Sequence, residues 1–286
     1  MTILVTGGNG QLGMALRLAS AEGRHRYIFT DIDELDITSA EAIEAVMAAE
    51  KPNAVVNCAA YTAVDMAEEQ EELAEMINHK AVAMLAEACA RHNATLIHIS
   101  TDYIFSGKAS APYTEEDTPA PLGAYGRTKL AGERAIEASG CSYIIVRTAW
   151  LYSEFGINFV KTMRNLTSTR QEIKVVADQI GTPTYAGDLA QAIVAILEGE
   201  QLYKCGIYNY SNLGKCSWYD FAVEIAQMSG NNGCKITPCT TAEYPTKALR
   251  PHYSVLDKSN FITTFGLAIP EWRVSLARCI ENLNRS

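Results

Sequence analysis

A tyrosine and a lysine stand four positions apart in the segment Tyr125-Gly126-Arg127-Thr128-Lys129. In a helix this spacing places both side chains on one face, so the ammonium would neighbour the phenol. An unperturbed tyrosine has a pKa of about 10. A nearby positive charge favours the phenolate and lowers that pKa. The pair suits proton transfer to the alkoxide that forms when a ketone accepts hydride. Because Tyr-x-x-x-Lys also occurs by chance in many helices, the interpretation needs a cofactor site.

Glycines at positions 7, 10 and 13 supply that expected cofactor site. They follow an apolar strand at 3–6 and open a helix at 11–19. Glycine permits a tight turn and a close approach of the backbone to a diphosphate. The helix amino terminus then offers N–H groups to the phosphates. A purely structural glycine turn is the alternative, but the context predicts a dinucleotide site that includes Gly7, Gly10 and Gly13.

Asp31 stands 18 positions after Gly13, at the end of the second expected strand. A carboxylate at that place accepts hydrogen bonds from the ribose hydroxyls and repels a 2′-phosphate. This favours NADH mildly over NADPH. An aspartate in a strand-end turn is the alternative. Arg17, Arg24 and Arg26 lie close enough in sequence to reach a phosphate, so the sequence leaves the preference open.

Thr101 and Asp102 follow the apolar strand expected at 95–99. In an open parallel sheet the carboxyl end of a strand faces the ligand crevice. A hydroxyl there can hydrogen-bond a substrate carbonyl as negative charge builds on its oxygen. Thr101 is therefore a candidate catalytic residue beside Tyr125 and Lys129. A turn or a helix cap is the alternative reading of this segment.

The elements that must position these residues alternate between strand and helix over the first half of the chain. Such repeats with apolar strands predict an α/β fold, a Rossmann-type doubly wound parallel sheet. We expect residues 1–150 to form the NAD(P)-binding domain, with 183–200 packing back on it. Residues 151–182 and 201–286 are expected to form a smaller, interleaved C-terminal α/β substrate-binding lobe.

Composition excludes several classes of protein. The 286 residues are 48% hydrophobic and 20% charged, which excludes a disordered chain. A net charge of −9 argues against nucleic acid or an anionic membrane as partner. Residues 1–150 hold 21 acidic and 11 basic side chains, whereas 151–286 hold 12 and 13, so an anionic substrate is expected at the later part.

The cysteines and the apolar segments indicate a cytoplasmic protein. Eight cysteines are scattered without a Cys-x-x-Cys pair, which favours free thiols over a zinc site or a disulfide framework. No secretory leader is evident at the first residues. No apolar run approaches the roughly 20 residues of a membrane span.

The glycine turn and the Tyr125–Lys129 pair resemble the extended short-chain dehydrogenase/reductases. Six further segments resemble one subgroup of these enzymes in particular, at 57–65, 100–105, 125–133, 147–152, 158–163 and 178–184. Together they are similar to the reductases that convert dTDP-4-dehydro-β-L-rhamnose to dTDP-β-L-rhamnose with NADH or NADPH. In that family the reaction reduces the C4 ketone and completes a sugar donor for cell-surface polysaccharides. Two other interpretations stay open. One is a nucleotide-sugar epimerase or dehydratase of the same fold, and the other is a non-catalytic cofactor-binding regulatory subunit.

The resemblance also implies a role for each matching position. The implied cofactor contacts are Gly10, Gln11 and Leu12 at the diphosphate, Asp31 at the ribose, Asp36 and Ile37 at the adenine, and Ala59, Ala60 and Tyr61 near the nicotinamide ribose. Thr101 and Asp102 would meet the sugar, with Trp150 beside it. Tyr125 would donate the proton, and Lys129 would bind the nicotinamide ribose. Asn78 matches a further proton-relay position.

Some positions depart from the family pattern or lack a match. Tyr61 stands where the family usually has histidine. The positions that hold a dimer-bridging Mg²⁺ in some members match Ala15, Gly187 and Gln191, none of which is a carboxylate, so no metal site is expected. We expect a monomer or a weak homodimer.

Three further expectations concern single residues or short runs. Arg250 is the best candidate for the substrate diphosphate, although a surface arginine before the turn at Pro251 is as good an interpretation. His98 is expected to be a satisfied core residue. The acidic run at 68–75 is expected to be a solvated helix face.

Overall fold

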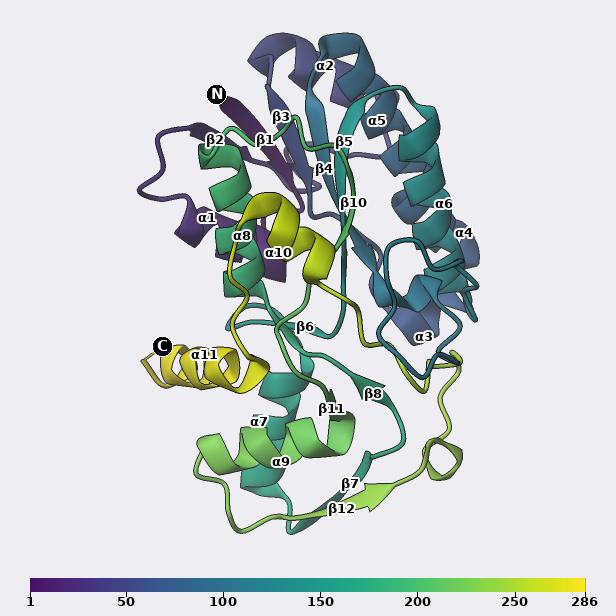
Figure 1. Cartoon of the computed structure of the whole chain (residues 1–286), viewed down its shortest axis with the longest axis vertical. Coiled ribbons are helices and arrows are strands. Elements are labelled where there is room, and N and C mark those ends of the chain that lie inside the picture. Colours follow the sequence, from purple (N-terminus) through teal and green to yellow (C-terminus); the bar gives the residue numbers. More distant parts are fainter. Residues whose placement is uncertain (286) are drawn as a thin grey trace.

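A six-stranded parallel sheet forms the centre of the larger lobe (Figure 1). The computed structural model describes residues 1–285. The strands are β1 (Thr2–Thr6), β2 (Arg26–Phe29), β3 (Ala54–Asn57), β4 (Thr95–Thr101), β5 (Ser142–Thr148) and β10 (Gly206–Asn209). Their order in the sheet is β10-β5-β4-β3-β1-β2, and every neighbouring pair is parallel. The predicted doubly wound α/β fold is confirmed.

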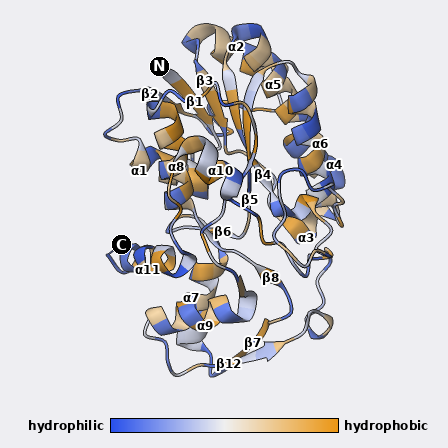
Figure 2. Ribbon diagram, viewed as in Figure 1, coloured by the Kyte–Doolittle hydropathy of each residue, from blue (hydrophilic) through white to orange (hydrophobic). Residues whose placement is uncertain are grey.

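Helices cover both faces of this sheet (Figure 1). One face packs against α1 (Gln11–Ala19), α8 (Ala186–Glu198) and α10 (Ser259–Phe265). The other packs against α2 (Ala40–Glu50), α5 (Ala81–His92) and α6 (Ala124–Ala138). Successive side chains of a strand point to opposite faces. Ile3 and Val5 therefore enter the first core and Leu4 the second. Figure 2 shows the resulting apolar strands enclosed between helices.

The strand order creates the crevice in which the site lies. The chain passes from β1 outward to β2 and then returns to β3 on the other side of β1. The segments that follow β1 and β3 consequently diverge at the carboxyl edge of the sheet. Gly7 follows β1 and Cys58 follows β3, so both line this crevice.

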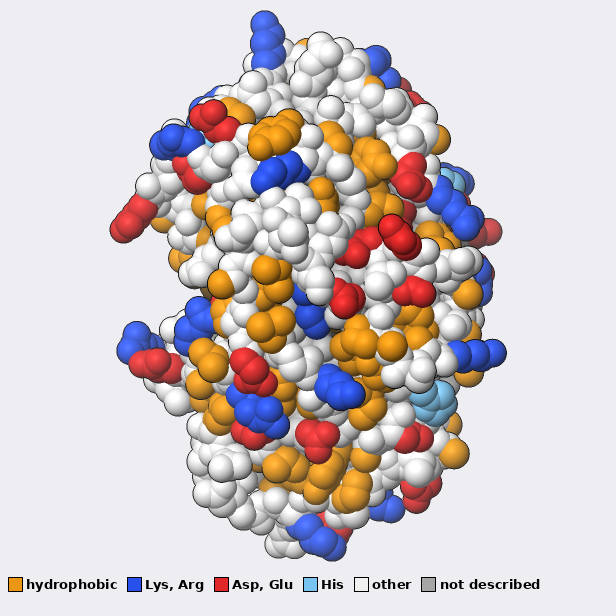
Figure 3. Space-filling model, in the orientation of Figure 1, with side chains coloured by type: hydrophobic (Ala, Val, Ile, Leu, Met, Phe, Trp, Pro, Cys, Tyr) orange, Lys and Arg blue, Asp and Glu red, His pale blue; other side chains and the backbone are white. Residues whose placement is uncertain are grey.

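A smaller lobe lies below this edge in Figure 1. It contains α7 (Phe159–Thr169), α9 (Trp218–Met228) and α11 (Trp272–Arg285) around a separate apolar core. Three short strand pairs complete it: β7 (Glu172–Val176) with β12 (Lys235–Cys239), β8 (Ile180–Gly181) with β11 (Cys216–Ser217), and β6 (Leu151–Tyr152) with β9 (Thr184–Tyr185). Figure 3 shows the outline indented between the two lobes at the left.

The structure corrects part of the predicted division. β10 and α10 lie within 201–286, which the sequence assigned to the smaller lobe, yet both belong to the larger one. β10 pairs with β5 as the edge strand, and Phe261 and Phe265 of α10 enter the core that contains β1. A four-residue strand at the edge of a sheet carries too short an apolar run to be assigned before its partner strand is known.

The helical region between residues 64 and 92 is divided into several elements. α3 (Val64–Ala67) and α4 (Glu71–Glu75) precede a π-helical turn at Met76–Lys80, which continues into α5. A π-helical turn inside a helix often marks a functional site. Glu71 and Glu72 of α4 lie exposed, as expected, whereas Glu75 is half-buried and contacts His79. None of the described helices is long and apolar enough to cross a membrane, and the eight cysteines are free thiols.

Candidate active site

Helix α6 carries Tyr125 and Lys129 to the carboxyl edge of the sheet. Its third residue faces the turn after β4, because a side chain at Gly126 would collide with the carbonyl oxygen of Tyr103. This close approach puts the Tyr103 and Tyr125 rings edge to face, with centroids 5.5 Å apart. The glycine inside the Tyr-x-x-x-Lys motif is thus required by packing. It fixes how deeply the phenol enters the crevice.

Tyr125 is a protonated phenol in this environment. Burial raises its pKa above the ordinary value, and a hydrogen bond with Thr101 offsets only part of that effect. The sequence predicted a pKa lowered by Lys129, whereas the structure shows the opposite direction. The reason is that burial removes the water that would stabilise a phenolate. A protonated phenol is the form that can donate a proton during a reduction.

Lys129 is almost wholly enclosed, and only 1% of its surface is exposed. Its Nζ donates a hydrogen bond to the carbonyl oxygen of Ile99 at 2.6 Å and lies 3.2 Å from Nε2 of His98. Burial lowers its pKa to about 8, against the opposing effect of the Glu133 carboxylate. A lysine so placed sits close to the point of losing its charge.

Thr101 and Asp102 occupy the end of β4. The Thr101 hydroxyl donates to Asp102 at 3.2 Å and accepts from the backbone N–H of Tyr103 at 3.2 Å. Thr101 therefore caps the short 3₁₀ turn at Asp102–Ile104, which was the structural alternative, and it also reaches Tyr125. Burial raises the pKa of Asp102 to about 6.

The glycine turn forms the amino terminus of α1. Gly7 has a φ of +66°, and a side chain at Gly13 would collide with the Gly7 carbonyl oxygen, so both positions exclude larger residues. Gln11 is held from the smaller lobe, because its Oε1 accepts hydrogen bonds from Ser153 Oγ at 3.0 Å and Asn158 Nδ2 at 2.9 Å. These two contacts, which sequence reasoning missed, connect the lobes at the expected diphosphate position.

A first cavity, of about 440 Å³, lies above this turn. We call it the cofactor cavity. Seven predicted cofactor residues line it: Gly7, Gly10, Asp31, Asp36, Ile37, Ala59 and Ala60. Asp31 accepts hydrogen bonds from the backbone N–H groups of Asn9 and Ile32. Hydrogen bonds from Thr38 hold the pKa of Asp36 below its ordinary value, so it is ionised. The cavity thus presents two carboxylates.

A second cavity, of about 570 Å³, contains the candidate catalytic groups. We call it the catalytic cavity. Predicted residues on its wall are Gln11, Leu12, Thr101, Asp102, Tyr125, Lys129, Trp150 and Arg250. It shares Gly10, Cys58 and Ala60 with the cofactor cavity, so the two adjoin. A ligand that spans both would bring its far end to Tyr125.

Tyr61 and Gly13, both predicted to bind the cofactor, are not among the residues that line these two cavities. The amide of Asn78, in the π-helical turn, accepts from the backbone N–H of Tyr61 at 2.9 Å and donates to its carbonyl oxygen at 3.0 Å. The same amide donates to Thr128 at 3.2 Å. Asn78 therefore holds the loop after β3 against α6. The Tyr61 hydroxyl donates to Gln70.

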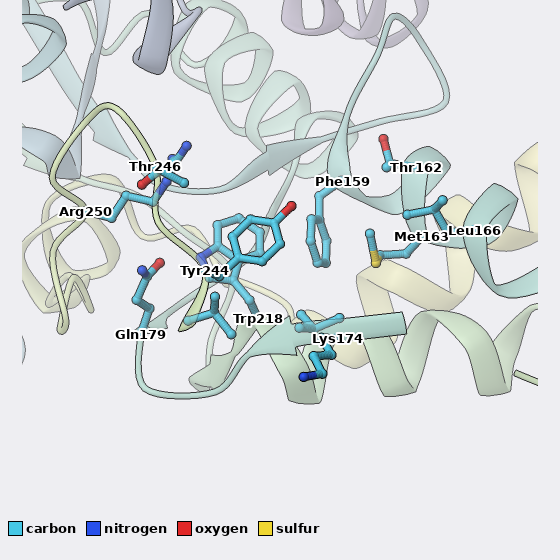
Figure 4. A pocket seen from close by; sticks show the side chains of 12 residues that line it. Phe159, Thr162, Met163, Leu166, Lys174, Gln179, Trp218, Tyr244, Thr246 and Arg250 are labelled. Carbon is cyan, nitrogen blue, oxygen red and sulfur yellow. The ribbon is translucent and has the colours of Figure 1, made fainter. Parts of the chain in front are cut away.

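A third cavity, of about 360 Å³, extends into the smaller lobe (Figure 4). We call it the distal cavity. It shares Phe159, Trp218 and Arg250 with the catalytic cavity. Trp150 stacks on Trp218 with centroids 3.5 Å apart, and its φ of +47° turns the chain at this point. Phe159, Trp218 and Tyr244 were not singled out from the sequence, since isolated aromatic residues on a helix or a loop carry no spacing signal.

Arg250 lines both the distal and the catalytic cavity, at the place where they meet. Its Nη2 pairs with Asp65 at 2.6 Å, and its Nη1 donates to the Tyr103 hydroxyl at 3.0 Å. The side chain is 24% exposed, so it is neither a free surface arginine nor a buried one. A fixed guanidinium at a groove wall suits an anionic ligand.

This chain is similar to known proteins over almost its whole length. A sequence profile for the family described as RmlD substrate binding domain matches residues 1–285. The chain belongs to this family. A dTDP-4-dehydrorhamnose reductase from Aggregatibacter actinomycetemcomitans is 42% identical over 96% of both chains. The crystal structure of a dTDP-4-dehydrorhamnose reductase from Clostridium acetobutylicum is 46% identical, with a TM-score of 0.95, and covers 99% of this chain and 100% of that chain.

A second solved member of the RmlD family bears on the cofactor. The dTDP-4-dehydrorhamnose reductase from Bacillus anthracis, solved in complex with NADP, is 38% identical with a TM-score of 0.91. It covers 98% of this chain and 99% of that chain. The resemblance stated from the sequence motifs is confirmed over almost the whole chain.

Proposed function

We propose that this chain is an NAD(P)H-dependent oxidoreductase that reduces the C4 ketone of dTDP-4-dehydro-β-L-rhamnose to dTDP-β-L-rhamnose, the last step in forming that sugar donor. The observation that carries the proposal is that three cavities adjoin through shared wall residues, with Thr101, Tyr125 and Lys129 on the middle one. A dinucleotide and a nucleotide sugar both need an elongated groove, and their reacting ends must meet beside an acid.

The glycine turn and the cofactor cavity fit a nicotinamide dinucleotide. Side chains at positions 7 and 13 would fill the turn. Because Gly7 and Gly13 have none, backbone N–H groups at the start of α1 are free to approach a diphosphate. Asp31, Asp36 and Ile37 would receive the adenosine half. When bound, the reduced nicotinamide supplies the hydride for C4.

Tyr125 then provides the proton. As hydride arrives, negative charge develops on the C4 oxygen, and the buried phenol donates its proton there. The Thr101 hydroxyl hydrogen-bonds the same oxygen and stabilises the developing charge. Lys129 orients the ribose side of the cofactor and stabilises the phenolate that remains. Asp102 and Trp150 bound the space for the sugar.

We propose a preference for NADH over NADPH. Among the described residues that line the cofactor cavity there is neither a lysine nor an arginine, whereas Asp31 and Asp36 both face it. Arg17, which the sequence left as a possible phosphate ligand, lies over the Phe29 ring at 4.3 Å. A 2′-phosphate would therefore meet negative charge without a compensating cation.

We assign the thymidine diphosphate to the distal cavity. Trp218, Phe159 and Tyr244 offer aromatic faces against which a base can stack (Figure 4). Arg250 lies where this cavity meets the catalytic one and would bind the phosphates after exchanging Asp65 for them. The basic balance of residues 151–286 relative to 1–150 favours the same placement.

The proposal includes a cytoplasmic monomer or weak homodimer. Ala15, Gly187 and Gln191, the positions matching a Mg²⁺ bridge, offer no carboxylate. Residues 1–150 with α8 hold the cofactor, and 151–182 with most of 201–286 hold the nucleotide sugar.

Loss of NADH absorbance on adding enzymatically generated dTDP-4-dehydrorhamnose, repeated with NADPH, tests the function. We expect stoichiometric oxidation with dTDP-rhamnose as product, and a higher kcat/KM with NADH. Tightly copurifying NAD with no net cofactor consumption would instead support an epimerase or dehydratase. Cofactor binding without turnover, together with a stable enzyme partner, would support a regulatory subunit.

A further inference from the structure

A chain of buried polar side chains runs across three strands beneath the catalytic cavity. Thr6 ends β1, Asn57 ends β3 and His98 lies within β4, and each is 1% exposed or less. Thr6 Oγ1 is 2.7 Å from Asn57 Oδ1, Asn57 Nδ2 is 3.1 Å from His98 Nδ1, and His98 Nε2 is 3.2 Å from Lys129 Nζ. This series of buried side chains therefore ends at the lysine of the Tyr-x-x-x-Lys motif.

A backbone N–H sets the orientation of the Asn57 amide. The oxygen Oδ1 accepts from the N–H of Ala59 at 3.1 Å as well as from Thr6. A backbone N–H can only donate, so rotating the amide would place its NH₂ group against another donor. Nδ2 is consequently the atom that faces His98, and it too can only donate.

The orientation of Asn57 then determines which ring nitrogen of His98 carries a proton. Nδ1 must accept the hydrogen bond from Asn57, so it is unprotonated. Burial is the largest cause that holds the pKa of His98 well below its ordinary value, so the ring is neutral. Its single proton is therefore on Nε2 and points at Lys129 Nζ.

An ammonium group at Lys129 could not accept this N–H. A protonated lysine has three donors and no lone pair, whereas the neutral amine has one lone pair. The neutral amine would accept from His98 and still donate to Ile99. We propose that His98 is a positioning residue that presents an N–H group to Lys129 and so favours its uncharged amine before the cofactor binds.

This inference rests on the proposed function, in which Tyr125 donates a proton. An uncharged Lys129 leaves the phenol protonated until a substrate oxygen takes the proton, which agrees with the raised pKa of Tyr125. Other titratable groups act on Lys129 as well. Glu133 on α6 and Cys58 after β3 both favour its charged form, and Glu133 is itself paired with Arg147 of β5.

The protonation of His98 is measured directly by nitrogen-15 NMR of the cofactor-free full-length chain with labelled histidine. Only five histidines are present, and His98→Gln assigns its signals. We expect an unprotonated Nδ1 and a protonated Nε2 near neutral pH. A proton on Nδ1, or on both nitrogens, overturns the inference. Because the measurement needs no substrate, failure of the proposed reductase activity would leave it unaffected.

An isosteric change at Asn57 tests the donor–acceptor direction of these hydrogen bonds. In Asn57→Asp both oxygens of the ionised side chain can only accept, so Ala59 and Thr6 keep their partner while His98 must donate from Nδ1. We expect the ring proton to move from Nε2 to Nδ1. An unchanged tautomer in a folded Asn57→Asp protein contradicts the proposed mechanism.

The effect on Lys129 is measured from the carbon-13 shift of labelled lysine against pH, in the same cofactor-free protein. His98→Leu removes the N–H group, and the Lys129 titration should rise by about one pH unit. His98→Gln retains a donor and an acceptor, so its titration should stay near the wild-type value of about 8 or below.

His92→Gln, at a partly buried histidine paired with Glu44, is the matched control. Equal titrations in the Leu and Gln variants would reduce His98 to a packing role. If His98→Leu does not fold, the wild-type and Asn57→Asp spectra decide.

Discussion

The ion pair between Glu133 and Arg147 holds α6 to the sheet, and removing it should destabilise the whole larger lobe. Glu133 lies two turns beyond Tyr125 on α6, and Arg147 lies on β5. The two residues are 1% and 2% exposed. The carboxylate accepts from Arg147 Nη2 at 2.7 Å, from Nε at 3.1 Å, and from the Ser100 hydroxyl. Glu133→Gln would leave a buried guanidinium without its counter-charge.

The expected loss is large for a single substitution. Breaking a buried pair by removing one partner costs about 3–5 kcal/mol, because the remaining charge stays desolvated. That is a substantial fraction of the roughly 5–15 kcal/mol by which such domains are stable. A second effect reaches the active site. The Glu133 carboxylate raises the pKa of Lys129, against the effect of burial, so its loss should lower that pKa below about 8.

Urea unfolding at constant pH, followed by fluorescence, measures the first effect. Glu137→Gln is the matched control, since Glu137 is exposed on the same helix, and it should change stability by less than about 0.5 kcal/mol. In Glu133→Gln combined with Arg147→Met, no buried charge of the pair remains, so the loss should be smaller than the sum of the two single losses. A loss below about 1 kcal/mol for Glu133→Gln would refute the reasoning, because the pair would then be screened by water.

Three further predictions concern the catalytic and cofactor cavities. Tyr125→Phe should lower kcat by about 10²–10⁴-fold, the usual contribution of a proton donor, while fluorescence titration gives an unchanged Kd for NADH; retained turnover would contradict its role. Asp31→Asn should lower the ratio of kcat/KM for NADH to that for NADPH by about tenfold, since roughly 1.4 kcal/mol of repulsion disappears, and an unchanged ratio would show that Asp31 does not sense the 2′-phosphate. Asp102→Asn should stabilise the protein above pH 6. The folded-state pKa of Asp102, about 6, exceeds the ordinary value of 3.8, so between pH 3.8 and 6 the native state binds more protons than the unfolded state. As pH rises through this range, the buried carboxylate must ionise and the native state loses stability. Unfolding curves at pH 4 and pH 7.5 should therefore differ in their response to the substitution, with a gain of about 1–3 kcal/mol only at the higher pH, and equal responses would count against the buried carboxylate.

The sequence predicted more of the cofactor side than of the substrate side. Gly7, Gly10 and Asp31 are consecutive features of one βα unit, so their spacing already implies their arrangement. Trp218 and Tyr244 reach the distal cavity from a helix and a loop far apart in the chain. Nothing in the spacing of such residues marks them as neighbours, because only the packing of the smaller lobe brings them together.

The local chemistry of this protein follows from the sequence alone. Residue types at short spacing determine the glycine turn, the strand ends and the helix face that carries Tyr125 and Lys129. The protonation of these groups was decided by the tertiary structure. Burial raises the pKa of Tyr125, although the motif alone predicts a lower one. His98 illustrates the same difference: the sequence marks a strand histidine, and only the packing of three strands and α6 brings it to Asn57 and Lys129. Solvation and hydrogen-bond partners depend on which segments surround a group, and sequence spacing does not encode that.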